Sequence, residues 1–368
     1  MKIALLSRYE RSGSSSRLRS YQYLPWLAER GIETAAFPLL SDSYLARLYA
    51  GDGTDRFAVA AGYAKRMSAL LRVGRFDAVW LEREALPFAP GWFDTLLLRA
   101  RGIPYVVDYD DAVFHDYDRH RSRAVRALLG GKIDRVMRDA ETVIVGNEYI
   151  RQRAVQAGAR KVKLLPTVVD LSRYRLKDEP SPTFTVGWIG TPITAKFLSI
   201  VRGALRQVCA DGRGRFLATG AGSLQMPDVP LEVAPWTEQQ EAESIRACDV
   251  GIMPLFDGEQ ERGKCGYKLI QYMACGLPVV ASPVGMNAHL VVHGENGYLA
   301  SNEKEWVDAL SRLRNDPALR QRMGAAGRRL VEAEYSIPAT VDRLADVLRG
   351  AVNTGKSRVR RVVPTYLP

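Results

Sequence analysis

The chain has 368 residues, of which 46% are hydrophobic, and a formal net charge of +11. A single core rarely grows beyond roughly 250–300 residues, so we expect about two domains, and the ordinary apolar fraction excludes disordered and fibrous classes. The apolar run at the N-terminus is too short for a signal peptide, and no stretch approaches the roughly 20 apolar residues that span a bilayer. These features predict a cytoplasmic protein.

The four cysteines are scattered. Cys265 and Cys275 are the closest pair, and even these lack the short spacing of a metal-binding motif. We predict free thiols in a reducing compartment and no metal site built on cysteine.

Much of the positive charge is local. Residues 119–138 carry seven Lys or Arg and one acid, and residues 356–361 add four basic residues. Either nucleic acid or an anionic membrane would suit this charge. Because no helix-turn-helix pattern or aromatic RNA-binding signature accompanies it, we predict contact with a membrane surface and no nucleic acid. A solvated basic helix and a frayed tail remain the structural alternative.

In chain order, the first half begins with an apolar strand at 2–7, a small-residue loop at 13–16 and a helix from about 18 to 29. Arg17 and Arg19 flank this loop, which follows a strand end, where open α/β sheets bind ligands. The other elements expected in this half are helices within 41–75 and at 93–101, 119–138 and 147–157, and strands at 76–81, 103–107, 142–145 and 161–166.

Three carboxylates follow the strand at 103–107, namely Asp108, Asp110 and Asp111. Burying them is costly unless they meet water, a metal or hydroxyl groups. Asp108 and Asp110 share one strand face, which suits a divalent metal or sugar hydroxyls. An Asp-rich helix N-cap is the alternative, although a cap needs one such residue and three are present.

A polar, proline-containing linker at 177–182 separates the two halves, and strand–helix alternation then begins again. The expected strands are 184–189, 215–219, 231–234, 250–255, 279–281 and 298–300, and the expected helices are 194–209, 238–247, 266–274, 303–313 and about 337–348. Two such sets predict an α/β protein with two doubly wound parallel sheets.

The strongest site signal lies between Val250 and Pro283. Its loop feeds the helix at 266–274, so backbone N–H groups near Cys265 and Gly266 would face an anion. Three cations surround this helix start: Arg262, Lys264 and Lys268. We predict a phosphate site here, and a solvated basic turn is the alternative.

A further cation lies at the start of another predicted helix. The turn at Gly190 and Thr191 leads into the helix predicted at 194–209, with Lys196 in its first turn. A lysine is unfavourable at this end of the helix dipole, which indicates that Lys196 faces an anion.

These residues resemble glycosyltransferase family 4, the retaining nucleotide-sugar transferases of the GT-B type. GKCGYKLIQYMACGLPVVASPVG, followed by HGENGYLA, is similar to the donor-binding signature of that family, and LLPTVVD, VGWIGTP and the Tyr335-Ser336 turn support it. The resemblance covers nearly the whole chain. It implies two Rossmann-like domains facing a cleft, an acceptor-side domain at 1–176 and a nucleotide-sugar domain at 183–336. It also implies that a C-terminal helix, 337–368, packs back onto the first domain.

The resemblance also implies roles for single residues. The diphosphate would meet the backbone near Cys265 and Gly266 and the cations at 196, 262, 264 and 268. Most members carry two glutamates eight positions apart that hold the sugar and the ribose. This chain has Gly263 and Gln271 there. Gln271 can hydrogen-bond a ribose without charge, and Glu259 or Glu261 in the same loop would replace the missing sugar contact.

In the first half, Asp110 is the nearest match to a histidine that the family often carries, and it would contact the donor sugar or the acceptor hydroxyl. The residues expected to meet acceptor or phosphate are Arg17, Arg19, Asp108 and Asp111. The catalytic residues expected are Asp110, Lys196 and Lys268, and those binding the nucleotide sugar are Gly190, Thr191, Arg262, Lys264, Cys265, Gly266 and Gln271.

The resemblance therefore implies a retaining, metal-independent glycosyltransferase that moves a sugar from a UDP- or GDP-sugar to a hydroxyl of a surface polysaccharide or lipid-linked glycan precursor. No cofactor beyond this co-substrate is expected, and the protein would lie at the inner face of the membrane. Two alternatives are a GT-B epimerase or phosphorylase and a non-catalytic sugar-nucleotide-binding assembly partner.

Overall fold

A computed structural model describes the chain except for residues 52, 101, 178–180, 182 and 363–368. The chain forms two compact units: unit 1 comprises 1–167 and the chain from Thr340 onward, and unit 2 comprises 168–339. This division lies earlier than the predicted linker at 177–182, of which 178–180 and 182 are outside the described residues. The reason is that Arg173 and Tyr174 already bond within unit 2, to Glu238 and Glu241.

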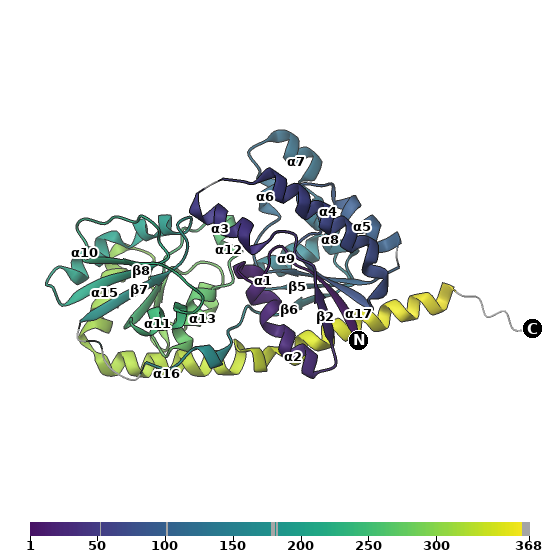
Figure 1. Ribbon diagram of the computed structural model, residues 1–368. Coiled ribbons are helices and arrows are strands. Elements are labelled where there is room, and N and C mark those ends of the chain that lie inside the picture. Colours follow the sequence, from purple (N-terminus) through teal and green to yellow (C-terminus); the bar gives the residue numbers. More distant parts are fainter. Residues whose placement is uncertain (52, 101, 178–180, 182, 363–368) are drawn as a thin grey trace, which may run out of the picture. The chain divides into compact units, whose positions relative to one another are not determined.

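Unit 1 contains a six-stranded parallel sheet in the order β2-β1-β3-β4-β5-β6 (Figure 1). Its strands are β1 (Lys2–Leu6), β2 (Glu33–Ala36), β3 (Ala78–Glu82), β4 (Tyr105–Tyr109), β5 (Thr142–Val145) and β6 (Val162–Leu164). The chain order reverses between β1 and β3, as in a doubly wound sheet. β4 ends two residues later than predicted, so Asp108 lies within the strand and pairs with Ile144 of β5.

The helices of unit 1 cover both faces of this sheet. They are α1 (Ser14–Arg19), α2 (Leu24–Glu29), α3 (Asp42–Ala50), α4 (Arg56–Arg72), α5 (Gly91–Ala100), α6 (His115–Asp118), α7 (Arg123–Leu129), α8 (Lys132–Asp139), α9 (Glu148–Gln156) and α17 (Ile337–Val362), with 3₁₀ turns η1 (Tyr21–Tyr23) and η2 (Val73–Arg75). One apolar core joins alternate strand residues to side chains of α4, α5, α8 and α9. α17 is tied to η1 by a 2.8 Å hydrogen bond between the Tyr23 and Thr340 hydroxyls.

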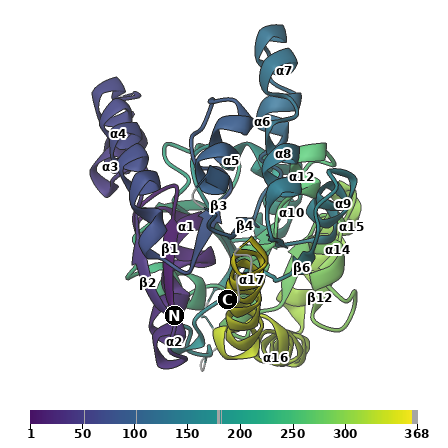
Figure 2. The ribbon, with the colours of Figure 1, turned by 90° about the vertical axis from the view of Figure 1, so that its right-hand side faces the viewer.

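Two of the predicted helices are interrupted. The helix expected at 18–29 starts earlier, as α1, and restarts at α2, where Pro25 occupies the first turn; proline is accepted there but would break a helix interior. The basic helix expected at 119–138 is divided into α7 and α8 at Gly130-Gly131, after the short α6. α7 projects from unit 1 (Figure 2).

Unit 2 repeats the architecture with a parallel sheet in the order β12-β11-β10-β7-β8-β9. Its strands are β7 (Phe184–Ile189), β8 (Gly214–Thr219), β9 (Leu231–Ala234), β10 (Val250–Met253), β11 (Val279–Ala281) and β12 (Gly297–Leu299). The chain order reverses between β7 and β10. The two parallel sheets with flanking helices confirm the predicted α/β class.

The helices of unit 2 differ more from the sequence expectation. They are α10 (Arg202–Cys209), α11 (Glu241–Arg246), α12 (Glu259–Arg262), α13 (Tyr267–Ala274), α14 (Asn287–Leu290), α15 (Glu303–Asn315) and α16 (Pro317–Glu334), with 3₁₀ segments η3 (Leu171–Arg173) and η4 (Ala195–Ile200). The helix predicted at 194–209 is η4 followed by α10, and α16 was not predicted. All four cysteines are buried and free of disulfides.

Candidate functional site

The loops after β7 and β10 form the candidate site of unit 2, because they lie where the strand order reverses. Open α/β sheets bind ligands outside the carboxyl ends of their strands at such a point. Two aromatic rings join the loops: Phe197 of η4 and Phe256 after β10 have centroids 5.6 Å apart. The predicted turn at Gly190 and Thr191 and the predicted α13 start therefore belong to the same edge of one sheet.

α13 is held over this edge by Tyr272. Its ring lies against Gly251 of β10, where an added Cβ would come within 2.1 Å of the ring. Its hydroxyl accepts a hydrogen bond from the Ile189 backbone N–H at 2.9 Å. The end of β7 and the body of α13 are thereby fixed to each other.

Gly266 occupies the position before the first residue of α13. Its φ of +68° lies in the left-handed region, and an added Cβ would meet Leu290 Cδ1 at 2.4 Å. Both facts require glycine here. The geometry turns the chain abruptly into a helix whose first-turn N–H groups point out of its N-terminal end.

Lys268 lies one residue inside α13 and faces the loop after β7. Its Nζ is 4.3 Å from the centroid of the Trp188 ring and 3.5 Å from Thr194 Oγ1. Burial, with a smaller contribution from the nearby charge of Lys264, lowers the pKa of this ammonium to about 7. Lys268 forms no ion pair with any described residue, so an arriving anion would restore its full charge.

Two other predicted cations, Lys196 and Arg262, lie near the loops after β7 and β10 and differ in their contacts. Lys196 is exposed on η4, with its Nζ 5.1 Å from the Phe197 ring centroid. Arg262 ends α12 and makes a two-point ion pair with Asp257, at 2.7 and 3.0 Å. Gly263 and Cys265 are buried in the link between α12 and α13.

Gln271 is buried inside unit 2 and belongs to a polar chain that the sequence did not predict. Its Nε2 donates to the Tyr174 hydroxyl at 3.0 Å, and that hydroxyl donates to Glu241 Oε1 at 2.9 Å. Trp236 Nε1 donates to the second oxygen of Glu241 at 2.8 Å. A carboxylate is therefore present two hydrogen bonds from Gln271, contributed by α11. The sequence signal for it was the pair of aromatic residues Tyr174, directly after η3, and Trp236, after β9.

In unit 1 the structure brings Arg19 and Asp108 together. Arg19 donates from Nε and Nη2 to Asp108 Oδ1 at 2.9 and 2.8 Å, and both side chains are almost wholly buried. Arg19 also bonds Leu165 O and Thr167 Oγ1. Burial raises the pKa of Asp108 to about 6, although Arg19 acts in the opposite direction. This pair links α1, β4 and the segment after β6.

Asp110 lies beside a second guanidinium. Arg83 has a φ of +61°, an unusual conformation for a residue with a side chain, and its Nη2 lies 2.8 Å from Asp110 Oδ1 and 2.7 Å from Ser15 Oγ. Burial tends to raise the pKa of Asp110, but Arg83 and Ser15 outweigh it and leave that pKa below the ordinary value. Arg17 is buried on α1. Asp111 accepts a hydrogen bond from the backbone N–H of the following residue, Ala112, at 2.9 Å.

The acidic cluster does not assemble as a metal site. Among the described residues, no group of three or more His, Cys, Asp or Glu side chains comes together in a way that could hold a metal ion. In the same described part of the chain, no helix combines the length and apolar character needed to cross a bilayer.

Two family models match the chain. The model described as "Glycosyl transferase 4-like domain" matches residues 5–167, and "Glycosyl transferases group 1" matches 184–316; together they cover about four fifths of the chain. The chain belongs to the family 4 glycosyltransferases of the GT-B type. Each model corresponds to one of this glycosyltransferase's two parallel sheets.

Curated relatives match parts of the glycosyltransferase. D-inositol 3-phosphate glycosyltransferase of Streptosporangium roseum is 33% identical over 161 residues, which are 41% of this chain and 36% of that protein. The protein of the same name from Rhodococcus erythropolis is 26% identical over 225 residues, 53% and 50% of the two chains. The first of these matches thus spans about a third of the relative's length.

Solved structures match the glycosyltransferase over 95–96% of its length at low identity. Anabaena Alr3699/HepE in complex with UDP and glucose has a TM-score of 0.69 and 16% identity, covering 95% of this chain and 99% of that one. Sucrose-phosphate synthase from Thermosynechococcus elongatus has a TM-score of 0.70 and 17% identity, covering 96% and 100%. At such identities the likeness shows the GT-B fold.

Proposed function

We propose that this glycosyltransferase transfers a hexose from a nucleoside diphosphate sugar, a UDP- or GDP-sugar, to a hydroxyl group, with retention of configuration and without a metal. The observation that carries the proposal is Lys268, a largely buried cation with no carboxylate partner among the described residues, at the start of α13 and at the switch point of the sheet. Helix starts and unpaired cations favour a diphosphate.

The reaction needs little from side-chain nucleophiles. The acceptor oxygen forms a bond to the anomeric carbon while the bond from that carbon to the β-phosphate oxygen breaks, and the electron pair leaves with the diphosphate. Lys268, Lys196 and the backbone at Gly266 would stabilise this developing charge. The leaving phosphate oxygen would accept the acceptor proton on the same face, which accounts for retention.

The ribose half of the donor would meet Gln271. Because its amide nitrogen donates to Tyr174, its carbonyl oxygen would accept from a ribose hydroxyl. Glu241 would supply, through Tyr174, the negative charge that most family members place at position 271 itself. Asp110 and Asp111 remain our proposal for contacts to the transferred sugar or the acceptor hydroxyl.

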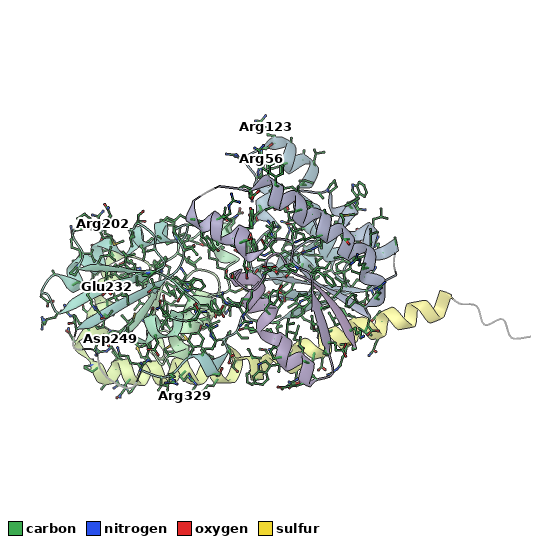
Figure 3. The ribbon with its side chains drawn as sticks, in the orientation of Figure 1. Arg56, Arg123, Arg202, Glu232, Asp249 and Arg329 are labelled. Atoms are coloured by element: carbon green, nitrogen blue, oxygen red, sulfur yellow. The ribbon has the colours of Figure 1, made fainter. Side chains whose placement is uncertain are left out.

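A surface polysaccharide or lipid-linked glycan precursor is the acceptor class that we propose, presented at an anionic membrane. The support is the exposed end of unit 1, where α7 carries Arg123 and Arg126 beside Leu128, which is 81% exposed. Arg56, next to the 89% exposed Phe57, lies at the same end of this unit as Arg123 (Figure 3). Basic residues interleaved with exposed apolar ones suit a bilayer surface. Lys132, also counted in the predicted basic helix, is instead buried against Glu84.

The donor proposal is tested by thermal unfolding with a panel of nucleoside diphosphates and their sugars, followed by product analysis with and without acceptor. A ligand at 100 times its dissociation constant adds about 2.7 kcal/mol to the free energy of unfolding. Transfer only when an acceptor is present supports the proposal. Sugar isomerisation without acceptor would indicate an epimerase, and binding without any turnover would indicate an assembly partner.

The membrane proposal is tested by co-sedimentation with vesicles containing phosphatidylserine. Replacing Arg123 and Arg126 by serine should weaken binding by about 1 kcal/mol for each arginine. The matched control replaces Lys304 and Arg329, exposed cations of unit 2, and should bind like the unaltered protein. Equal binding of all three proteins would exclude α7 as the docking surface.

A further inference from the structure

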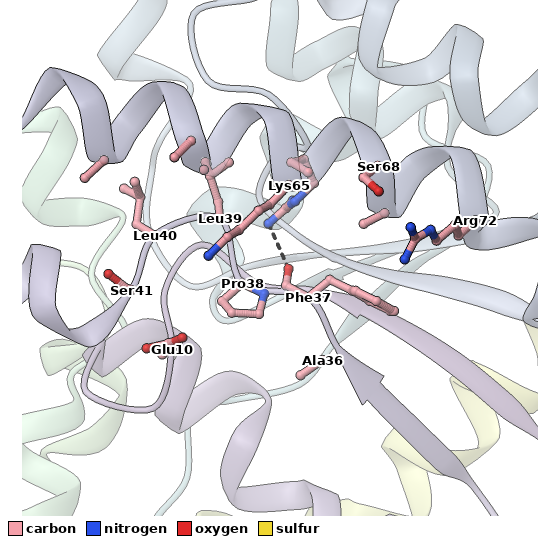
Figure 4. Close-up of a pocket in the computed structure, with 15 residues that line it drawn as sticks. Glu10, Ala36, Phe37, Pro38, Leu39, Leu40, Ser41, Lys65, Ser68 and Arg72 are labelled. Carbon is pink, nitrogen blue, oxygen red and sulfur yellow. Dashed lines mark hydrogen bonds between the residues drawn. The ribbon is translucent and has the colours of Figure 1, made fainter.

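A hollow lies wholly within unit 1, between α4 and the segment that follows β2. It has a volume of about 540 Å³, and its wall includes Pro38, Ala58, Ala61 and Ala69. Figure 4 shows α4 along one side and Ala36, Phe37 and Pro38 along the other. The small side chains of α4 leave the space open, and the carboxyl end of β2 forms its floor. We call this hollow the α4 groove.

Cations from α4 project along the groove. Lys65, Ser68 and Arg72 line it from successive turns of the helix, and Figure 4 shows them on the same side of the cavity. Lys65 and Arg72 are seven positions apart in the sequence, which corresponds to about 10 Å along the helix axis. Both are exposed, and neither forms an ion pair with any described residue. The one acid in the wall, Glu10, accepts a hydrogen bond from the Asp42 N–H at 2.8 Å.

A third cation lies beneath this surface. Arg66 is 1% exposed and donates only to carbonyl groups: those of Ser7, Phe37 and Ala85. The contact with Phe37, 3.1 Å long, is the dashed line in Figure 4. Its Nε is buried without a hydrogen-bond partner, and Arg66 forms no ion pair within the described residues. The wall of the groove therefore carries positive charge that carbonyl dipoles compensate only in part.

We propose that the α4 groove binds the phosphate monoester of a phosphorylated acceptor, with Lys65 and Arg72 on the phosphate oxygens and the alanine-lined wall against the body of the molecule. Two separated cations and a serine hydroxyl suit a dianion better than a single carboxylate. The role of acceptor rests on the proposed transferase function, whereas phosphate binding itself does not. Phosphate esters reach such a groove either as soluble polyol phosphates or as lipid phosphates.

Calorimetric titration with two probes that share one head group separates these sources: sn-glycerol 3-phosphate, which is soluble, and dihexanoyl phosphatidic acid, which carries short acyl chains. Binding of both supports the proposal with a soluble ester, and binding of the lipid alone supports it with a lipid phosphate. Replacing both Lys65 and Arg72 by alanine should weaken either probe at least tenfold. Arg75→Ala, which removes an exposed cation just beyond the groove, should leave the affinity within twofold.

UDP binding, measured on the same variants, distinguishes this inference from the proposed function. Lys65 and Arg72 belong to unit 1 and should leave UDP affinity unchanged, and urea midpoints should confirm that the variants are folded. Absence of binding by both probes, or an equal loss in Arg75→Ala, would overturn the groove as a phosphate site. Failure of UDP to bind any variant, with the phosphate probes still bound, would count against the transferase proposal instead.

Discussion

Charged side chains at the strand ends of the two units are arranged in opposite ways. At the carboxyl end of β4 in unit 1, Asp108 and Asp110 are each matched by a guanidinium, from Arg19 and Arg83. After β7 and around α13 in unit 2, Lys196 and Lys268 have no acidic partner among the described residues. Charge that is neutralised within a unit stabilises the fold, whereas charge left uncompensated at a ligand-binding edge is available for a substrate.

The comparison is tested most strongly by Asp108→Ala. Removing this carboxylate leaves Arg19 buried and unpaired, which should cost about 3–5 kcal/mol in the free energy of unfolding. Urea unfolding measures the loss. The double change Arg19→Met with Asp108→Leu should recover most of it, because an apolar pair can replace a buried ion pair. Normal stability with a raised KM for the acceptor would instead assign Asp108 to the substrate.

Lys268→Ala should leave the fold intact and lower kcat/KM for the donor by about 10²–10³, the effect of removing one preorganised group from a developing charge. Lys196→Ala should have a smaller effect, since this side chain is exposed. Steady-state kinetics with Lys304→Ala as the control measures both. Donor turnover close to that of the unaltered protein in both variants would remove the phosphate site as proposed.

Gly266→Ala should cost about 1–3 kcal/mol, since it places a side chain at a positive φ and against Leu290. Gly294→Ala is the matched control, because Gly294 has a φ of +85° but nothing within 4 Å of an added Cβ. The difference between their chemical unfolding midpoints reports the tight contact at the start of α13. Equal losses would show that this contact does not restrict position 266.

The smallest expected effect is on pH dependence. With its pKa at about 7, the Lys268 amine is largely uncharged at pH 8 when no ligand is bound, and binding of UDP must return a proton to it. UDP affinity should therefore be flat below pH 7 and fall by up to about tenfold per pH unit above it. Lys268→Gln should abolish the slope in calorimetric titrations. A slope that persists in this variant would assign the titration to another group.

The sequence predicted every described strand except β2 (Glu33–Ala36), for which no strand was expected. Thr142–Val145, Phe184–Ile189, Leu231–Ala234 and Val279–Ala281 match β5, β7, β9 and β11 to the residue. Buried parallel strands form short continuous apolar runs, which few other elements resemble. Helices were harder to delimit, since apolar periodicity passes through breaks such as Gly130-Gly131. α16 was missed although Asp316 and Pro317 form an ordinary helix start.

The candidate site was only partly readable. The start of α13 was evident because its glycine and cations are adjacent in the chain. The pairing of polar side chains was not evident from the sequence, because the partners are far apart in the chain. Arg19 and Asp108 lie 89 residues apart, and Gln271 and Tyr174 lie 97 residues apart. Whether a charge meets a partner or a ligand depends on such distant contacts, which local patterns do not contain.

The hydrogen bond between Tyr23 and Thr340 joins residues 317 positions apart and makes unit 1 discontinuous in sequence. During synthesis, the strands of unit 1 are made before unit 2, but α17, with buried residues such as Leu344 and Leu348, is made after it. At about 5–20 residues per second, the interval from residue 167 to residue 340 lasts about 9–35 s. Unit 2 can fold within that interval, while unit 1 still exposes the apolar surface that α17 will cover. The apolar surface that α17 covers in the folded protein therefore stays open to intermolecular contact for at least this interval.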